Sequence, residues 1–303
     1  MEGKKITAVL AGILAAACLI VTIVLVSVNR KTKYLPVTAV DDLVDVLDAA
    51  GIGIDPDIIE TKRERGDVFV FDSADYYDTV AGLLCKESLS ETFATPDGNL
   101  LLFENGAILE FGADFSFRYS KDGKKHSVPD REYMTEATLD PTDEYKDAAE
   151  EAVKFLNSGS RSFAQSENIS IITNADIVFG DGEKYYVECS RTLDGVAITD
   201  NTVVCTCCDG EVIAAEGKWC FFTSGESYSA QLTDHLNILF NARNDIIIPE
   251  RKKVNITSVE KCYSLYYYGD GEDFCLIPCW QISTDIAGDY IYNALDGTIH
   301  TNN

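Results

Sequence analysis

Residues 202–215 read TVVCTCCDGEVIAA, two apolar runs on either side of an Asp-Gly pair. The runs predict one strand over 202–208 and another over 211–215, because short apolar runs bounded by turn residues are typical of strands. The Asp-Gly pair predicts a turn between the two strands. This stretch therefore predicts an antiparallel hairpin, the building block of an antiparallel sheet.

A turn also recurs as Asn-Gly at 105–106 and as Asp-Gly at 296–297, each followed by a short apolar strand. The Asn-Gly pair predicts a two-residue hairpin turn, in which both central residues take positive φ. The two later units also share Gly-Asp-Gly-Glu, at 180–183 and 269–272. Each unit reads as a helix, then strands, then a turn into a last short strand, which indicates an internal repeat. A helix that covers one face of an antiparallel sheet is a stable two-layer arrangement. The sequence thus predicts an α+β fold of serial helix-plus-antiparallel-sheet units.

Four amphipathic helices are predicted to alternate with the strands. In the first, Val40, Leu43 and Leu47 have the 3.6-residue spacing of a buried helix face, and Asp41 or Asp42 is the expected cap. The other three are expected after Ser73, from Pro141 with Thr142 as its cap, and after Ser227 or Ser229.

The N-terminus carries the longest apolar run, ITAVLAGILAAACLIVTIVLVSV at residues 6–28, with no charged side chain. A helix of this length spans about 34 Å, enough for a hydrocarbon core of about 30 Å. The run predicts one transmembrane helix that acts as a signal anchor. Two alternatives stay open: a cleaved signal peptide, whose apolar region is usually shorter, and a lipoprotein, because Ala-Ala-Ala-Cys at 15–18 weakly resembles a lipidation box.

Basic residues flank the run almost equally, with Lys4 and Lys5 before it and Arg30, Lys31 and Lys33 after it. Orientation is instead predicted from position, since long C-terminal domains translocate largely regardless of local charge. We expect a single-pass protein of the cell membrane with an extracytoplasmic C-terminal domain. The predicted division is a cytoplasmic N-terminus at 1–5, the membrane helix at 6–28, a first unit at 37–135, and a tandem pair at 141–303 that splits into 141–226 and 227–303.

Small residues recur every four positions in the apolar run, at Ala8, Gly12 and Ala16 and again at Ala11 and Ala15. Small side chains at this spacing let two helices approach closely in lipid. Ala and Gly are also common in membrane helices without such a role. The pattern predicts that the helix is an interface with a partner helix as well as an anchor.

The chain is strongly acidic, with 50 Asp and Glu against 25 Lys and Arg and a net charge of −25. Such a domain is repelled by nucleic acid, so no nucleic-acid partner is expected. Acidity alone does not predict a calcium site, and the sequence contains no Asp-x-Asp-x-Asp-Gly loop.

Catalytic and metal-binding patterns are missing from the sequence. His126, His235 and His300 are scattered and have no neighbouring nucleophile or Cys pair. Most of the cysteines after the membrane run are interpreted as small buried apolar residues, with a few disulfides left open. We therefore expect no enzyme activity, no cofactor and no metal site.

The ends of the domain resemble a known family. IPCWQI at 277–282 and YIYNALDGTI at 290–299 are similar to the ending of YycI/YycH-type two-component regulatory proteins, with YycI the nearer likeness, and VFVFDSADYY at 68–77 is similar to their beginning. Pro restricts a strand entry, Trp buries apolar surface and Asn satisfies local backbone groups, so the motif is interpreted as structural. Its residues are Pro278, Trp280, Tyr292, Asn293, Ala294 and Gly297.

The resemblance implies a Gram-positive, membrane-anchored, non-enzymatic regulator with PepSY-like extracytoplasmic modules. Its implied partners are a YycH-like protein and a WalK-type sensor histidine kinase that controls cell-wall metabolism. Two other functions stay open: an extracytoplasmic module that binds a ligand or a wall component, and an inhibitor or chaperone of a surface protease.

Overall fold

The computed structural model describes residues 34–71, 76–85, 88–96, 98–112, 114–128, 143–159, 170–180, 183–222, 225–250, 252–268 and 273–300. Within these residues no helix is both long enough and apolar enough to cross a membrane. The apolar run at 6–28 lies outside them. The described part is an α+β fold, as predicted, in which a few helices accompany mixed sheet.

The chain divides into two compact units, each with its own core. The first unit comprises Met1–Gly66, Ala230–Glu260 and Trp280–Asn303, and the second comprises Asp67–Ser229 and Lys261–Cys279. These bounds differ from the serial units predicted at 37–135, 141–226 and 227–303. The difference comes from pairing between strands far apart in the sequence, which local patterns do not reveal.

In the first unit, residues near both ends of the chain share one core. Its elements are α2 (Val37–Ala49), β1 (Ile52–Ile54), the 3₁₀ helix η1 (Pro56–Ile58), α6 (His235–Ala242), β14 (Asp289–Asn293) and parts of β12 (Val254–Tyr268) and β13 (Asp273–Thr284). β1 pairs in parallel with β12, with Ile52 opposite Val254. Leu47, Ile52, Ile238 and Trp280 lie together in its buried cluster.

Two helix ends differ from their predicted positions. α2 begins directly after Pro36, so Asp41 and Asp42 lie inside the helix and do not cap it. The segment expected to start the fourth helix is a strand, β11 (Gly225–Gln231), and α6 begins only at His235. The side chain of Asp234 caps α6 by accepting a hydrogen bond from the Asn237 amide at 3.1 Å.

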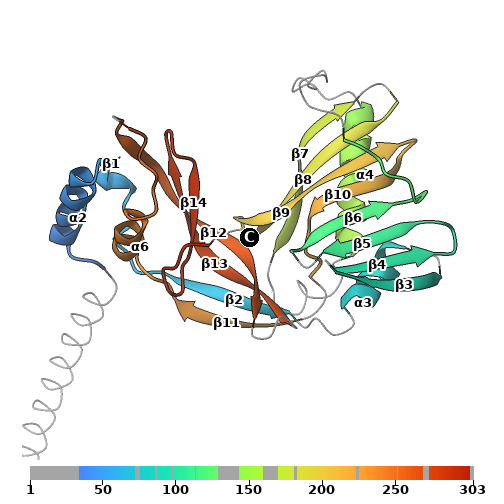
Figure 1. Cartoon of the computed structure of the whole chain (residues 1–303), viewed down its shortest axis with the longest axis horizontal. Helices are drawn as coiled ribbons and strands as arrows, with labels where there is room; N and C mark the ends of the chain where they lie inside the picture. The colour runs from blue at the N-terminus through green and yellow to red at the C-terminus, as the bar shows by residue number, and fades with distance from the viewer. Residues whose placement is uncertain are drawn as a thin grey trace, which may run out of the picture. The chain divides into compact units, whose positions relative to one another are not determined.

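The second unit contains the same motif twice: a helix followed by a four-strand antiparallel meander (Figure 1). The last strands of the two meanders pair, which gives the strand order β7-β8-β9-β10-β6-β5-β4-β3. The first motif is α3 (Tyr76–Leu84), β3 (Leu89–Thr95), β4 (Gly98–Phe103), β5 (Ile108–Gly112) and β6 (Ser116–Ser120); the second is α4 (Asp143–Ser158), β7 (Ile171–Gly180), β8 (Tyr185–Leu193), β9 (Val196–Cys208) and β10 (Glu211–Lys218).

The hairpin predicted at 202–215 is confirmed as β9, a turn and β10, with φ of 52° at Asp209 and 75° at Gly210. The prediction of positive φ at both residues of the Asn-Gly pair was wrong. Only Gly106 has it, while the Asn105 side chain accepts a hydrogen bond from the Ala107 amide at 2.9 Å. That side-chain bond forms an Asx turn, which takes the place of the two-residue turn.

One face of the second meander is covered by α4, which contacts all four of its strands. Ala148, Ala152 and Leu156 recur every four residues on the helix and are buried. The strands contribute alternate residues to this core, including Val203 and Cys205 of β9. The other alternate residues of these strands point to the opposite face of the sheet, and this face carries the site described below.

Candidate functional site

The residues predicted to form the membrane interface, Ala8, Ala11, Gly12, Ala15 and Ala16, lie outside the described residues. Their role stays a prediction. The other predicted site residues belong to the C-terminal motif, and all of them lie in the described part of the chain.

In the first unit, side chains of the C-terminal motif form hydrogen bonds with the residues at both ends of α6. Trp280 is 4% exposed, and its Nε1 donates a hydrogen bond to the Thr233 carbonyl at 2.9 Å. The hydroxyl of the fully buried Tyr292 donates to Asp245 Oδ2 at 2.9 Å. Both partners lie on the chain that enters and leaves α6. The aromatic pair therefore fixes both ends of this helix.

The turn that follows β14 also forms hydrogen bonds with α6 and the chain just before it. The Ala294 carbonyl accepts from the Thr233 amide at 2.6 Å, and Asn293 Oδ1 accepts from the Leu295 amide at 2.8 Å. Gly297 has a φ of 79°, which favours glycine, and its carbonyl accepts from Asn241 Nδ2 at 3.0 Å. Pro278 was expected at the entry to a strand, but it lies buried in the interior of β13 in the second unit, because the strand already begins at Asp273. These contacts fit the structural interpretation of the motif.

His235, one of the three scattered histidines, is a buried partner of this motif. Its ring meets Trp280 edge to face, with centroids 4.3 Å apart. Its Nδ1 accepts a hydrogen bond from the Glu60 amide at 3.0 Å, while its Nε2 is buried without a hydrogen-bond partner. Burial lowers the pKa of His235, although Glu60 and Asp234 act in the opposite direction. The fold therefore favours the neutral ring.

This burial predicts an acid-sensitive first unit. Because the pKa of His235 is lower in the folded chain than the usual value of about 6.5, its contribution to stability is complete above that pH and is lost as the pH falls below it. We expect the urea midpoint of the first unit to fall on acidification below about pH 6.5. His235→Phe should flatten this part of the profile, whereas His126→Gln in the second unit should not. An unchanged slope in His235→Phe would refute the assignment.

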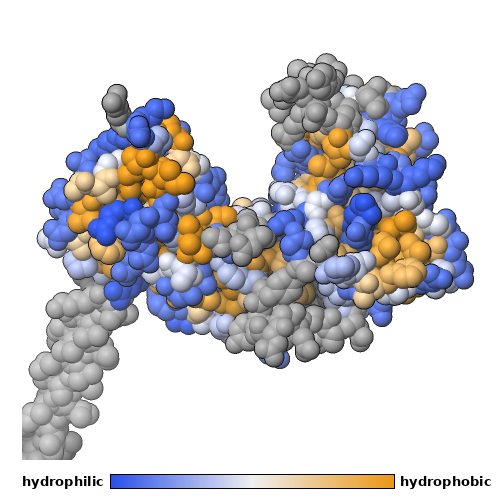
Figure 2. All heavy atoms as spheres, in the orientation of Figure 1, coloured by the Kyte–Doolittle hydropathy of each residue, from blue (hydrophilic) through white to orange (hydrophobic). Residues whose placement is uncertain are grey.

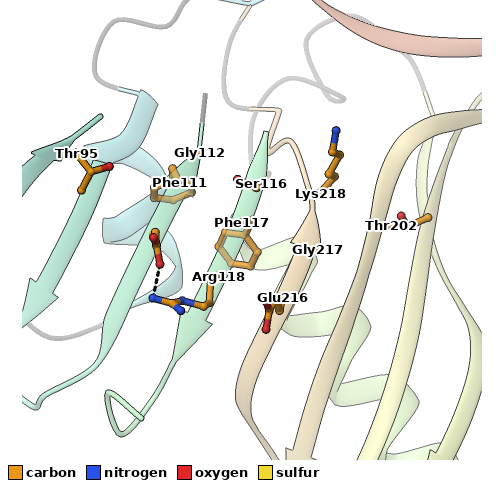
Figure 3. Close-up of a pocket in the computed structure, with 11 residues that line it drawn as sticks. Thr95, Phe111, Gly112, Ser116, Phe117, Arg118, Thr202, Glu216, Gly217 and Lys218 are labelled. Atoms are coloured by element: carbon orange, nitrogen blue, oxygen red, sulfur yellow. Dashed lines mark ion pairs between the residues drawn. The ribbon is translucent and has the colours of Figure 1, made fainter. Parts of the chain in front are cut away.

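A hollow of about 630 Å³ lies on the face of the sheet where β5, β6, β9 and β10 come together (Figure 3). Glu110, Arg118 and Glu216 stand side by side across three paired strands, as the strand register shows. Arg118 forms an ion pair with Glu110, marked by the dashed line in Figure 3. The remaining polar lining comes from Thr95, Ser116, Thr202 and Lys218.

Glycine creates part of this hollow. Gly98 of β4 lies opposite Gly112 of β5 in the register, so neither strand projects a side chain there. A Cβ on Gly98 would lie 1.8 Å from the Phe111 carbonyl oxygen, and its φ of 150° also disfavours other residues. The pair therefore keeps this end of the sheet face open.

A second hollow of about 420 Å³ adjoins the first and shares Thr202, Glu216 and Gly217 with it. Asp176 and Glu188 also line it, so three carboxylates meet there. Asp176 is the extra residue of a β-bulge in β7, between Ala175 and Ile177. Such a bulge re-aims a side chain on a sheet face.

This face presents part-exposed charges of both signs on paired strands. Among the described residues no group of His, Cys, Asp and Glu is arranged to hold a metal ion. Both hydrophilic and hydrophobic patches are visible on the surface of this unit (Figure 2).

This face was not predicted from the sequence. The residues that line its two hollows come from seven strands, and strands such as β5 and β6 show only an ordinary alternation of buried and more exposed positions. The alternation of Phe117 and Tyr119 with Arg118 signals a half-buried strand, but not which strands become neighbours. The pairing of β6 with β10 is what brings Arg118 next to Glu216.

The prediction that most cysteines are buried apolar residues is confirmed. All of those after the apolar run at 6–28 are buried except Cys208, which is part-exposed. Burial raises the pKa of Cys85, Cys207 and Cys220 to about 12. A thiol with so high a pKa is a weak nucleophile, since the thiolate is the reactive form.

Comparisons with known proteins assign no family. No protein-family model matches the chain, and no curated protein matches it. Among solved structures, the chain is similar to an uncharacterized protein from Eubacterium rectale ATCC 33656. The TM-score is 0.44 at 11% sequence identity, with 82% of this chain and 90% of that chain covered. This likeness carries no argument about function.

Proposed function

We propose that the protein is a non-enzymatic regulator, anchored in the cell membrane by a single helix, that modulates a WalK-type sensor histidine kinase controlling cell-wall metabolism. The observation that carries the proposal is the uncharged run at 6–28, in which Ala8, Gly12 and Ala16 recur every four residues. The resemblance of the C-terminal motif to YycI/YycH-type proteins supports it. A YycH-like protein is the proposed second partner.

In this proposal the extracytoplasmic domain is built from PepSY-like modules. The two motifs of a helix and an antiparallel meander in the second unit support this part of it. Regulation would be a shift in population: contact with the membrane helix and the extracytoplasmic domain favours one state of the kinase over another. The size of the shift is bounded by the difference in affinity of the regulator for the two states.

A second function is favoured by the sheet face of the second unit. The two hollows, with their carboxylates and cations, suit an extracytoplasmic module that binds a ligand without any kinase. The two functions differ in what they require of the membrane run. The first needs its small residues, whereas the second needs only attachment to the membrane.

The membrane helix provides the test of the kinase proposal. Gly12→Leu is expected to reduce kinase co-purification with the full-length, tagged protein from native membranes by about tenfold or more, because a large side chain separates the two helices by blocking close packing. Replacing residues 6–28 with poly-Leu should abolish it. The measurement is the ratio of kinase to bait by quantitative mass spectrometry.

The matched control is Ala17→Leu. In a helical repeat Ala17 lies on the side opposite Gly12, so the same increase in volume should leave co-purification unchanged. Equal losses in both variants would refute a specific interface. If no kinase co-purifies with the unmodified protein, the kinase proposal fails and the ligand-binding module becomes the better description.

A further inference from the structure

β3 is an outer strand of the sheet in the second unit. Among the described residues it pairs with β4 alone, so its other side presents backbone N–H and C=O groups that no neighbouring strand receives. Every residue from Leu89 to Ala94 is exposed, including Leu89 at 42% and Phe93 at 44%. β3 is therefore open to pairing with a further strand.

The strand at the other end of this order, β7, differs from β3 in a way that hinders such pairing. A bulge between Ala175 and Ile177 interrupts its register with β8 and places the charged Asp176 there. Bulges and charged side chains are the features by which outer strands avoid pairing with other chains. In β3 the register shifts only at the start of the strand, and it is regular from Glu91 to Thr95. This regular run is the part of the edge that a further strand can follow.

The sheet face beside this run is apolar. Leu101 and Leu109 are fully buried in the core, so the residues that alternate with them point to the opposite face. Figure 2 shows a hydrophobic patch at the end of the second unit where Figure 1 places β3, β4 and β5. The apolar residues of this face, here termed the outer patch, are neighbours in the register: Phe93, Leu100, Leu102 and Ile108.

The same edge is poor in charge. With a net charge of −25, two copies of the chain repel each other, so they can associate only where charge is sparse. Residues 88–103, which include β3 and β4, contain two charged residues, Glu91 and Asp97, whereas charged residues make up 25% of the whole chain. This edge is thus a place where two copies can approach each other.

The run from Glu91 to Thr95 is also compatible with its own copy. In an antiparallel pair centred on Phe93, each Glu91 lies opposite Thr95 of the other copy, and the two Glu91 residues are about 14 Å apart along the strands. A two-fold axis between two antiparallel strands runs perpendicular to the sheet, so both outer patches lie on the same face and meet across the new pair.

We propose that two copies of the protein associate through β3, which pairs with its counterpart in antiparallel orientation, centred on Phe93. The exposed regular edge, the sparse charge and the two-fold match of the outer patches carry the assignment of a second copy as the partner. The contact involves the second unit only. It goes beyond the kinase proposal and does not depend on it.

Site-specific photo-crosslinking tests the contact. Two differently tagged forms of the full-length protein are expressed together in the native host, with p-benzoylphenylalanine in place of Phe93, an aromatic replacement without a change of charge. Irradiation should give a covalent dimer that carries both tags, and mass spectrometry should place the link within Thr92–Ala94 of the other copy. The matched control has the same photoreactive residue in place of Ile177 on β7, which is 38% exposed, and should give no dimer.

Two substitutions of Thr95 test the register. Thr95→Glu puts a carboxylate opposite Glu91 of the other copy, so the dimer Kd should rise at least fivefold, because like charges directly opposite each other destabilise a strand pair. Thr95→Lys puts an opposite charge there, so the Kd should fall at least twofold. Analytical ultracentrifugation of the full-length protein in detergent measures the Kd. Ile177→Glu and Ile177→Lys make the same changes of net charge on β7 and should change it less.

Three outcomes would overturn the proposal. One is the absence of a crosslinked dimer, and another is a crosslink from position 93 to a different protein. The third is an equal change of Kd at Thr95 and Ile177, which would show that net charge alone acts. Association through the membrane helix would give dimers without a link between the two β3 strands, so the result is distinct from that of the kinase test. The crosslink also decides the question if a charged variant does not fold.

Discussion

Trp280→Ala is expected to lower the free energy of unfolding of the first unit by about 3–5 kcal/mol, the range for truncating a buried Trp to Ala. The side chain is 4% exposed and lies in the buried cluster that also holds Leu47 and Ile238. Its removal leaves a cavity, takes the donor from the Thr233 carbonyl and exposes the ring of His235. Urea unfolding followed by near-ultraviolet circular dichroism measures the change.

Trp280→Phe separates the contribution of side-chain packing from that of the hydrogen bond to Thr233. This variant keeps much of the apolar volume but loses the hydrogen bond to Thr233. We therefore expect the free energy of unfolding to fall by about 1–2 kcal/mol, from the unpaired carbonyl and the smaller ring together. If Ala and Phe destabilise the unit equally, the hydrogen bond and not the packing dominates, and the interpretation of Trp280 as a core residue fails.

Arg191→Ala is expected to lower the free energy of unfolding of the second unit by about 3–5 kcal/mol, because it creates a cavity and leaves buried acceptors unpaired. Arg191 is 1% exposed and lies against two aromatic rings, with its Cζ 4.2 Å from the ring centroid of Trp219 and 5.1 Å from that of Phe222. Its Nη1 donates to the Cys220 carbonyl at 2.7 Å. Burial lowers the pKa of Arg191 to about 10, so the side chain stays charged at neutral pH.

Arg191→Met is the informative comparison. Methionine fills much of the same volume and carries no charge that must be desolvated, so its cost should be clearly smaller than that of alanine. The loss of stability in Arg191→Lys should lie between those of the Met and Ala variants, because lysine keeps the charge but lacks the planar guanidinium that stacks on Trp219. Should Met prove as damaging as Ala, the charge itself would be essential, contrary to this prediction. Thermal unfolding of the three variants settles the order.

Local features were predicted well because their causes lie within a few residues. The Asp-Gly pair at 209–210 forms a tight turn wherever two strands flank it, since its backbone conformation suits few other residues. The spacing of Val40, Leu43 and Leu47 likewise marks the buried face of a helix without reference to its surroundings. The burial of most cysteines also follows from their side-chain chemistry.

Predictions failed where one local signal competed with another. Ser227 and Ser229 are good helix caps, but they lie in a strand, and Asp234 caps the helix instead. The Asn-Gly pair at 105–106 forms an Asx turn because the Asn105 side chain bonds to the backbone two residues on. In such cases the sequence offers several possible caps or turn types, and the pairing of the strands determines which one forms.

The α+β class, the buried faces of α2 and α4, the 202–215 hairpin and the acidity of the chain were all evident from the sequence, because each depends on residue type and short-range spacing. The two discontinuous units, the burial of Arg191 and His235, and the two hollows on the sheet face follow from the tertiary structure alone. These arise where β1 meets β12 and β6 meets β10. Strands about 100 or 200 residues apart pair because the whole core closes around them, and no local pattern records that choice.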